Sequence, residues 1–338
     1  MAHWRKRSGA GERWVRVSSS MAACLRSTWV EYFATRWRQC DALRFLCSRL
    51  KVYKENGQLL FDTEKITYGL LKSGYLSFQL SWPRLYHRSA QLPPNEGSSY
   101  SESTIADAIH GFSVTGAVAP MVFITGSGIS CGSSKSGDTT TFYFIGASPS
   151  TKFYYFDTMR NSLSGAGLKC YDESGALTFN SLQYPLNIVD TISAPAPPTP
   201  TVWNGIKMYG VPFAGASMSA TRFINSGPYY CVARVFIAVG SGEFAASTTF
   251  SRSFGQGIMD NMSSPGTSGN PFPAYASMQA HMDGAYGAGG GIYFMACDAA
   301  RTTMLYSTTA ANSYFDIPTD RYPQALVIKT DDLPFPFN

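Results

Sequence analysis

One short stretch of this chain occurs twice. Residues 50–62 read LKVYKENGQLLFD and residues 168–180 read LKCYDESGALTFN, an offset of 168 − 50 = 118 positions. Seven of the thirteen matched positions are identical. In both stretches apolar residues precede and follow a polar cluster that contains glycine, which is typical of two strands joined by a tight turn. The sequence therefore predicts the same β-hairpin in two places.

Glycine places the turn in each copy. Gly57 and Gly175 lie at matched positions, and a short hairpin loop needs a residue of positive φ, which glycine adopts at the lowest steric cost. We expect the matched tyrosine and phenylalanine positions to be equivalent core positions, although two similar hairpins without a duplication would give the same pattern. The residues that define this hairpin motif are Tyr53, Gly57, Phe61, Tyr171, Gly175 and Phe179.

Strand patterns separated by Gly, Ser and Pro dominate from residue 50 onward, which predicts a mainly β protein. Each hairpin is expected to head one β-sandwich or barrel-like domain, the first at residues 50–166 and the second at residues 167–338. The proline-rich stretch 194–200 is expected to be a stiff joint early in the second domain. Residues 255–291 are rich in Gly, Ser, Met and Pro and predict a long loop that is functional, mobile or covered by a partner, and an assembly interface would supply its missing burial.

The first 49 residues differ from the rest in charge. They hold ten Lys or Arg against three acidic residues, whereas the other 289 residues hold seventeen against nineteen. From about residue 21 large apolar residues recur every three or four positions, which predicts a basic amphipathic helix. The helix would pack its Trp29, Phe33 and Trp37 stripe against the body or a neighbouring subunit. A membrane-surface role, or a start assigned too far upstream, are the alternatives.

The composition limits the partners of the body. Charged residues make up 14% of the chain, against roughly 25% in an average soluble protein. Beyond residue 49 the net charge is 17 − 19 = −2, so the body has no excess of basic residues for nucleic acid. No stretch approaches the ~20 apolar residues of a membrane span, and no signal peptide is expected. The seven cysteines form no close C-x-x-C pair and are expected to be mostly reduced.

One enzyme motif matches the sequence, but its context does not. Gly128 to Gly132 fits G-x-S-x-G, the strand-to-helix elbow that exposes a nucleophilic serine, here Ser130. No helix is expected after it, because residues 126–138 are predicted to form a loop between two strands, and His281 belongs to the other predicted domain. Metal-ligand clusters and phosphate-binding loops are also missing. We therefore expect no enzyme, no cofactor and no metal, with a serine esterase that uses Ser130 as a distant alternative.

The repeated phrase resembles the start of a family of small virion proteins of tailed bacteriophages. Residues 167–181, GLKCYDESGALTFNS, are similar to the N-terminal motif Gly-Leu-x-Val-x-x-x-x-Gly-x-x-x-Phe-Asp-Ser of that family. Residues 50–63 resemble the motif too, and the closing residues 322–329 and 333–337, YPQALVIK and LPFPF, resemble the way such proteins end. The resemblance implies a structural or adhesive role at the phage tail, without catalytic residues.

We therefore expect a virion protein of the tail or tail tip that is assembled in the host cytoplasm. Its expected partners are copies of itself in a closed ring, other phage tail proteins, and a host-surface glycan or receptor. A carbohydrate-binding module on a virion or secreted protein is the alternative, because exposed aromatic side chains also stack against sugar rings. The candidate interface residues are Trp29, Phe33, Trp37, Tyr275 and Tyr286.

Overall fold

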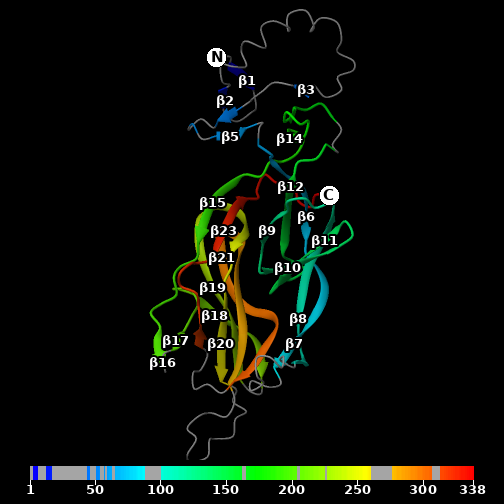
Figure 1. Cartoon of the computed structure of the whole chain (residues 1–338). Coiled ribbons are helices and arrows are strands. Elements are labelled where there is room, and N and C mark those ends of the chain that lie inside the picture. The colour runs from blue at the N-terminus through cyan, green and yellow to red at the C-terminus, as the bar shows by residue number, and fades with distance from the viewer. Residues whose placement is uncertain are drawn as a thin grey trace, which may run out of the picture. The chain divides into compact units, whose positions relative to one another are not determined.

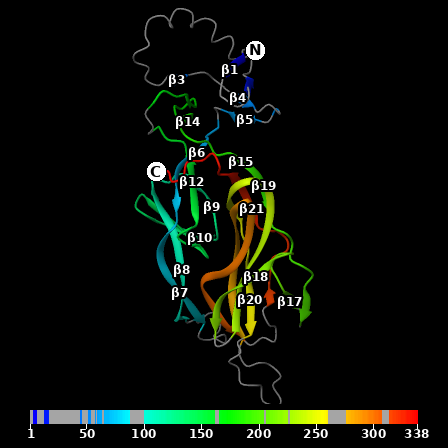
Figure 2. The same ribbon diagram turned by 180° about the vertical axis from the view of Figure 1, so that it is seen from behind.

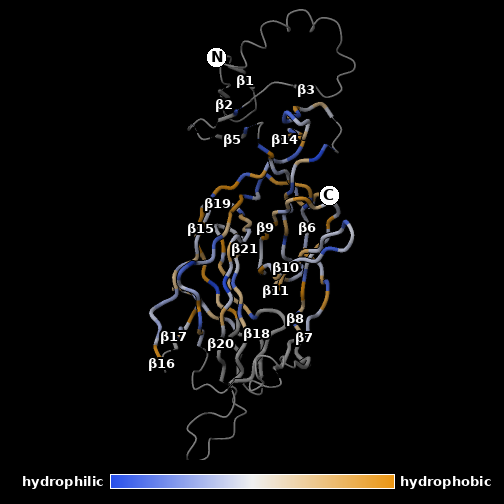
Figure 3. Tube along the Cα trace, viewed as in Figure 1, coloured by the Kyte–Doolittle hydropathy of each residue, from blue (hydrophilic) through white to orange (hydrophobic). Residues whose placement is uncertain are grey.

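The described part of the chain is mainly β. The computed structural model describes residues 3–6, 13–16, 44–45, 51–53, 57, 59–62, 65–87, 100–161, 165–203, 206–224, 227–259, 276–306 and 313–338. These residues form several sheets and no helix (Figure 1), which confirms the predicted class. Accordingly, no helix that could span a membrane occurs among them. Hydrophobic and hydrophilic positions alternate along many of the strands (Figure 3), as expected where successive side chains point to opposite faces.

The chain divides into two compact units. Unit 1 comprises residues 1–72, 118–120 and 155–186, and unit 2 comprises residues 73–117, 121–154 and 187–338. Each unit takes residues from both sides of the boundary that the sequence predicts between residues 166 and 167. The reason is that strands from distant parts of the chain pair with one another, which a local sequence pattern does not reveal.

Unit 1 contains short strands in small sheets. Its strands are β1 (His3–Lys6), β2 (Arg13–Arg16), β3 (Arg44–Phe45), β4 (Lys51–Tyr53), β5 (Leu59–Asp62), β13 (Lys169–Tyr171) and β14 (Leu177–Asn180). Strands β6 (Tyr68–Tyr75) and β12 (Lys152–Thr158) contribute residues to both units. The antiparallel pairs are β1 with β2, β4 with β5, and β13 with β14, while β3 joins β13 in parallel.

Strand β3 corrects part of the predicted N-terminal helix. Arg44 and Phe45 are extended, because they pair with Lys169 and Cys170 of β13. The helix prediction is therefore wrong for these two residues. The rest of the predicted helix, residues 21–43 and 46–49, lies outside the described residues.

Unit 2 contains the longest strands. They are β7 (Ser77–His87), β8 (Tyr100–Thr115), β9 (Met121–Thr125), β10 (Ile129–Ser136), β11 (Thr139–Ile145), β15 (Ile188–Ser193), β16 (Thr201–Trp203), β17 (Ile206–Tyr209), β18 (Ser217–Ile224), β19 (Gly227–Phe250), β20 (Ser253–Met259), β21 (Ala276–Tyr306), β22 (Ser313–Phe315) and β23 (Gln324–Lys329). In order of pairing, β10, β11, β8 and β7 lead to β21 and then β19. Strands β19 and β21 run side by side in both ribbon views (Figure 2) and pair antiparallel.

Two predicted loops of unit 2 are strands over much of their length. Within residues 126–138, β10 pairs with β11 over its whole length, so only a two-residue turn separates the strands. Within residues 255–291, β20 and β21 pair with each other, and only residues 260–275 lie outside the described residues. Glycine is required in this part of β21, because a Cβ atom at Gly287 would overlap the carbonyl oxygen of Phe244. Glycine at this position therefore reflects close backbone approach.

The core of unit 2 lies beneath β19 and β21. Burial of each large apolar side chain stabilises the fold by about 1.5–3 kcal/mol. Residues 194–200, the predicted joint, belong to the same unit, and Ala194 is buried in this core. The larger buried members of the core are Tyr209, Phe213, Val235, Phe244, Phe254, Ile292, Phe294, Tyr314, Ile317 and Val327.

Candidate functional site

The two copies of the repeated phrase form the same hairpin. In the first copy the paired residues are Lys51–Asp62, Val52–Phe61 and Tyr53–Leu59, and in the second they are Lys169–Asn180, Cys170–Phe179 and Tyr171–Leu177. Every pair of the second copy is offset by 118 from the first, and both ladders are irregular at the same step, between the second and third pair. Gly57 and Gly175 both have φ of +82°. The predicted hairpin and its glycine turn are therefore present in each copy.

The turn of the second copy is held by a carboxylate. Asp172 Oδ1 accepts hydrogen bonds from the Ser174 hydroxyl at 2.7 Å and from the Ala176 backbone N–H at 2.8 Å. The Ser174 contact is the larger cause that lowers the Asp172 pKa, followed by the Ala176 contact. Around this turn Tyr171 and Phe179 are half-buried, so neither is a fully buried core residue. The side chains of Tyr53 and Phe61 lie outside the description.

A buried polar side chain closes each hairpin. Asp62 is 4% exposed, and its Oδ2 lies 3.5 Å from Lys51 Nζ. The matched Asn180 is fully buried, donates from Nδ2 to the Arg160 carbonyl at 2.9 Å, and accepts from the Leu182 N–H at 3.1 Å. Aspartate and asparagine thus use the same position to fix the end of the second strand.

A strand follows each hairpin at a similar spacing. The same offset places β6 on residues 186–193, and β15 covers residues 188–193. Within unit 1 the start of β6 pairs antiparallel with residues 184–186, which precede β15: the Leu70 N–H donates to the Tyr184 carbonyl at 2.8 Å, and the Leu186 N–H donates to the Tyr68 carbonyl at 2.9 Å. Tyr68 and Leu186 are themselves 118 positions apart. One of these two hydrogen bonds therefore joins equivalent positions of the two copies.

The matched strands differ in exposure. Leu70 of β6 is fully buried, whereas its counterpart Ile188 of β15 is 41% exposed. The next position differs similarly, because Leu71 is half-buried and Val189 is 45% exposed. Strand β15 pairs with β23, and no other described strand pairs with it. We call β15, with Ile188 and Val189, the β15 edge.

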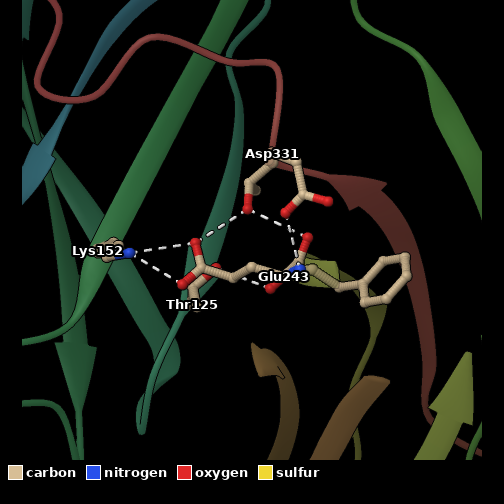
Figure 4. A network of polar contacts seen from close by, with 6 residues as sticks. Thr125, Lys152, Glu243 and Asp331 are labelled. Atoms are coloured by element: carbon tan, nitrogen blue, oxygen red, sulfur yellow. Dashed lines mark hydrogen bonds and ion pairs between the residues drawn. The ribbon is translucent and has the colours of Figure 1, made fainter. Parts of the chain in front are cut away.

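A polar junction ties four segments of unit 2 together (Figure 4). Lys152 Nζ of β12 lies 2.9 Å and 3.2 Å from the two carboxylate oxygens of Glu243 in β19. The Thr330 hydroxyl donates to Glu243 Oε1 at 2.9 Å, and the Glu243 N–H donates to Asp331 Oδ1 at 3.0 Å. Thr125 of β9 donates to the next carbonyl of β19, that of Phe244, at 2.8 Å. The junction fixes where the C-terminal segment leaves β23.

The C-terminal LPFPF stretch is part of the fold of unit 2. Ser73 and Phe337 exchange two backbone hydrogen bonds, of 2.7 Å and 3.0 Å. The Phe335 ring packs edge-on against Tyr75 with ring centroids 4.9 Å apart, and Lys152 Nζ lies 5.2 Å from its centroid. The stretch that resembles the family ending therefore has a packing role here.

A second polar cluster is fully buried. Arg252 Nε lies 2.8 Å from Asp283 Oδ2, and neither side chain is exposed. The guanidinium also donates to the carbonyls of Pro318 and Pro212, and lies 5.8 Å from the Phe254 ring centroid. Burial raises the pKa of Asp283 to about 6, although Arg252 acts in the opposite direction. The ion pair holds two loops against β20 and β21.

The esterase motif does not form an elbow. Ser130 lies inside β10, its partner across the ladder is Phe144, and the chain continues as a strand and not as a helix. His281 is fully buried, with Nε2 3.3 Å from Asp298 Oδ1. Among the described residues, no group of three His, Cys, Asp or Glu is placed to hold a metal ion. Neither the G-x-S-x-G motif nor a group of metal ligands therefore supplies an assembled catalytic site in the described part of the chain.

The candidate interface residues are only partly described. Tyr286 is 5% exposed and stacks on Tyr293, with centroids 5.2 Å apart, so its ring is interior and not at the surface. The other four, Trp29, Phe33, Trp37 and Tyr275, lie outside the described residues. Comparison with known proteins gave no match to a family, to a curated protein or to a solved structure.

Proposed function

We propose that this chain is a structural component of a bacteriophage virion, a tail or tail-tip protein that acts by assembly and takes part in host attachment. The observation that carries the proposal is the duplicated hairpin. The phrase that resembles the family motif is present twice, and both copies fold with the same register, the same irregularity and the same glycine conformation. Its partners are copies of itself and neighbouring tail proteins.

The β15 edge supports assembly as the mode of action. An edge strand offers backbone hydrogen-bonding groups to another chain. At this edge Ile188 and Val189 are both more than two-fifths exposed, although the matched Leu70 is covered within the chain. A strand from another subunit would cover the pair in the same way. Repetition of one such contact around an axis closes a ring.

A pair of edge variants tests the proposal. Ile188→Lys and Val189→Lys place a charge on the β15 edge, and Val202→Lys is the matched control, because Val202 is 66% exposed on β16. We expect light scattering to give an oligomer for the wild type and the control, and a smaller mass for both edge variants with an unchanged melting temperature. A wild-type monomer at every concentration would contradict assembly, and edge variants of full mass would exclude the β15 edge.

A further inference from the structure

An aromatic and basic cluster lies on one face of the β19–β21 ladder, which is exposed at Phe236 and is covered by Ser127 at the Arg234–Met295 pair. Val235 of β19 is 8% exposed and belongs to the core, whereas the next residue, Phe236, is 42% exposed. Arg234 precedes Val235 and therefore lies on the same face as Phe236, because side chains alternate along a strand. Directly across the ladder, Phe236 is paired with Tyr293.

The Phe236 and Tyr293 rings of this face and the interior ring of Tyr286 form a short aromatic ladder. The Phe236 and Tyr293 centroids are 5.0 Å apart at 52°, and the Tyr293 and Tyr286 centroids are 5.2 Å apart at 18°. A Cβ atom at Gly291 would lie 2.9 Å from Phe236 Cζ, so the Phe236 ring lies directly over that glycine. The exposed ring thus has a defined position before any ligand arrives.

The positive charge of the face is uncompensated within the described part of the chain. Arg234 Nη2 donates to the Ser127 hydroxyl at 3.3 Å, Arg234 Nε is buried without a hydrogen-bond partner there, and no described carboxylate pairs with the guanidinium. The charge lies close enough to Tyr286 to lower its pKa, although burial, the larger cause, raises that pKa to about 12. A guanidinium with spare donors is suited to a carboxylate, which it binds through two parallel hydrogen bonds.

We propose that Arg234, Phe236 and Tyr293 form a binding site for an acidic sugar. The carboxylate of the sugar binds Arg234, and the sugar ring packs on the exposed Phe236 ring. A neutral sugar would leave the guanidinium unpaired, and an acidic peptide would not need the aromatic ladder, so the acidic sugar uses the whole face. The inference does not depend on the virion assignment, since it holds equally for a secreted module.

Calorimetric titration of the full chain tests this site with 3′-sialyllactose as the acidic probe and lactose as its neutral match. We expect sialyllactose to bind at least about tenfold more tightly than lactose, because only sialyllactose carries the carboxylate. Arg234→Gln should weaken sialyllactose binding about tenfold, and Phe236→Ala about fivefold. The control is Arg321→Gln, which removes a charge that lies over the Phe250 ring, and should leave binding unchanged.

Several results would overturn the proposal. Equal affinity for the two sugars would remove the role of the charge, and so would an Arg234→Gln variant that melts and binds like the wild type. If sialyllactose does not bind at concentrations up to millimolar, acidic sugars are excluded as ligands of this face. If a glutamate-rich peptide binds and sialyllactose does not, the face takes an acidic protein segment and not a sugar. Should Arg234→Gln melt early, Phe236→Ala decides, because that ring is exposed.

Discussion

Removing Asp283 should destabilise unit 2 by several kcal/mol. In the Asp283→Ala variant the Arg252 guanidinium stays buried, with its contacts to the Pro212 and Pro318 carbonyls but without a negative charge. Loss of one partner from a buried ion pair costs about 3–5 kcal/mol, because the remaining charge is uncompensated. We expect a loss of about 4 kcal/mol in the free energy of unfolding of unit 2.

Removing both charges should cost much less. The double variant Arg252→Met, Asp283→Leu leaves no buried charge, and apolar side chains of similar volume often replace a buried ion pair at no net cost. The rings of Phe213 and Phe254 then contact methionine, with the loss of a cation–π contribution of about 1–2 kcal/mol. We therefore expect the double variant to be more stable than Asp283→Ala by about 2 kcal/mol or more.

Urea unfolding, combined with hydrogen exchange at the amides of β20 and β21, measures these differences within unit 2. Lys329→Ala is the matched control, because the Lys329–Asp331 pair is about two-fifths exposed and should contribute less than about 1 kcal/mol. A loss below about 1 kcal/mol for Asp283→Ala would refute the uncompensated-charge argument. A double variant as unstable as the single one would refute it too.

Three further predictions concern single residues. Gly175→Ala should lower the free energy of unfolding of unit 1 by about 1–2 kcal/mol in urea, because Gly175 has φ of +82°. The control is Gly210→Ala, at a glycine with open space around it, which should lower the free energy of unfolding of unit 2 by less. Asp157 is buried, which raises its pKa, but four hydrogen bonds outweigh this and leave the pKa below its ordinary value. The contribution of Asp157 to stability is therefore present at neutral pH and lost as the pH falls below about 4. In the Asp157→Asn variant the melting temperature should change less between pH 4 and pH 2 than in the wild type. Gly287→Ala should destabilise unit 2 by about 1–3 kcal/mol in the same urea assay, because its Cβ overlaps the Phe244 carbonyl, and a neutral result would contradict that close approach.

The sequence predicted what local patterns determine. The hairpins are local, since each turn glycine and its flanking strands lie within thirteen residues. The two strands expected on either side of residues 126–138 are also present, as β9 and β11. The two strands of each hairpin pair with each other, and β11 pairs with the adjacent β10.

The remainder depends on distant partners. Strand β10 contains four Ser together with Gly132 and Lys135, and Gly and Lys have low strand propensity. It is extended because β11 pairs with it. The Gly-rich part of β21 has its conformation because β19 approaches closely. Arg234 and Phe236 were missed as site residues, since alternation along β19 separates two faces but does not say which face the protein covers.

The mass and shape of the purified chain in solution test the central claim of assembly most directly. Light scattering and electron microscopy of one sample should show a closed oligomer, with a mass that is a small multiple of 36.8 kDa and visible rotational symmetry. A stable monomer of 36.8 kDa at all concentrations, without rings in the micrographs, would contradict the claim.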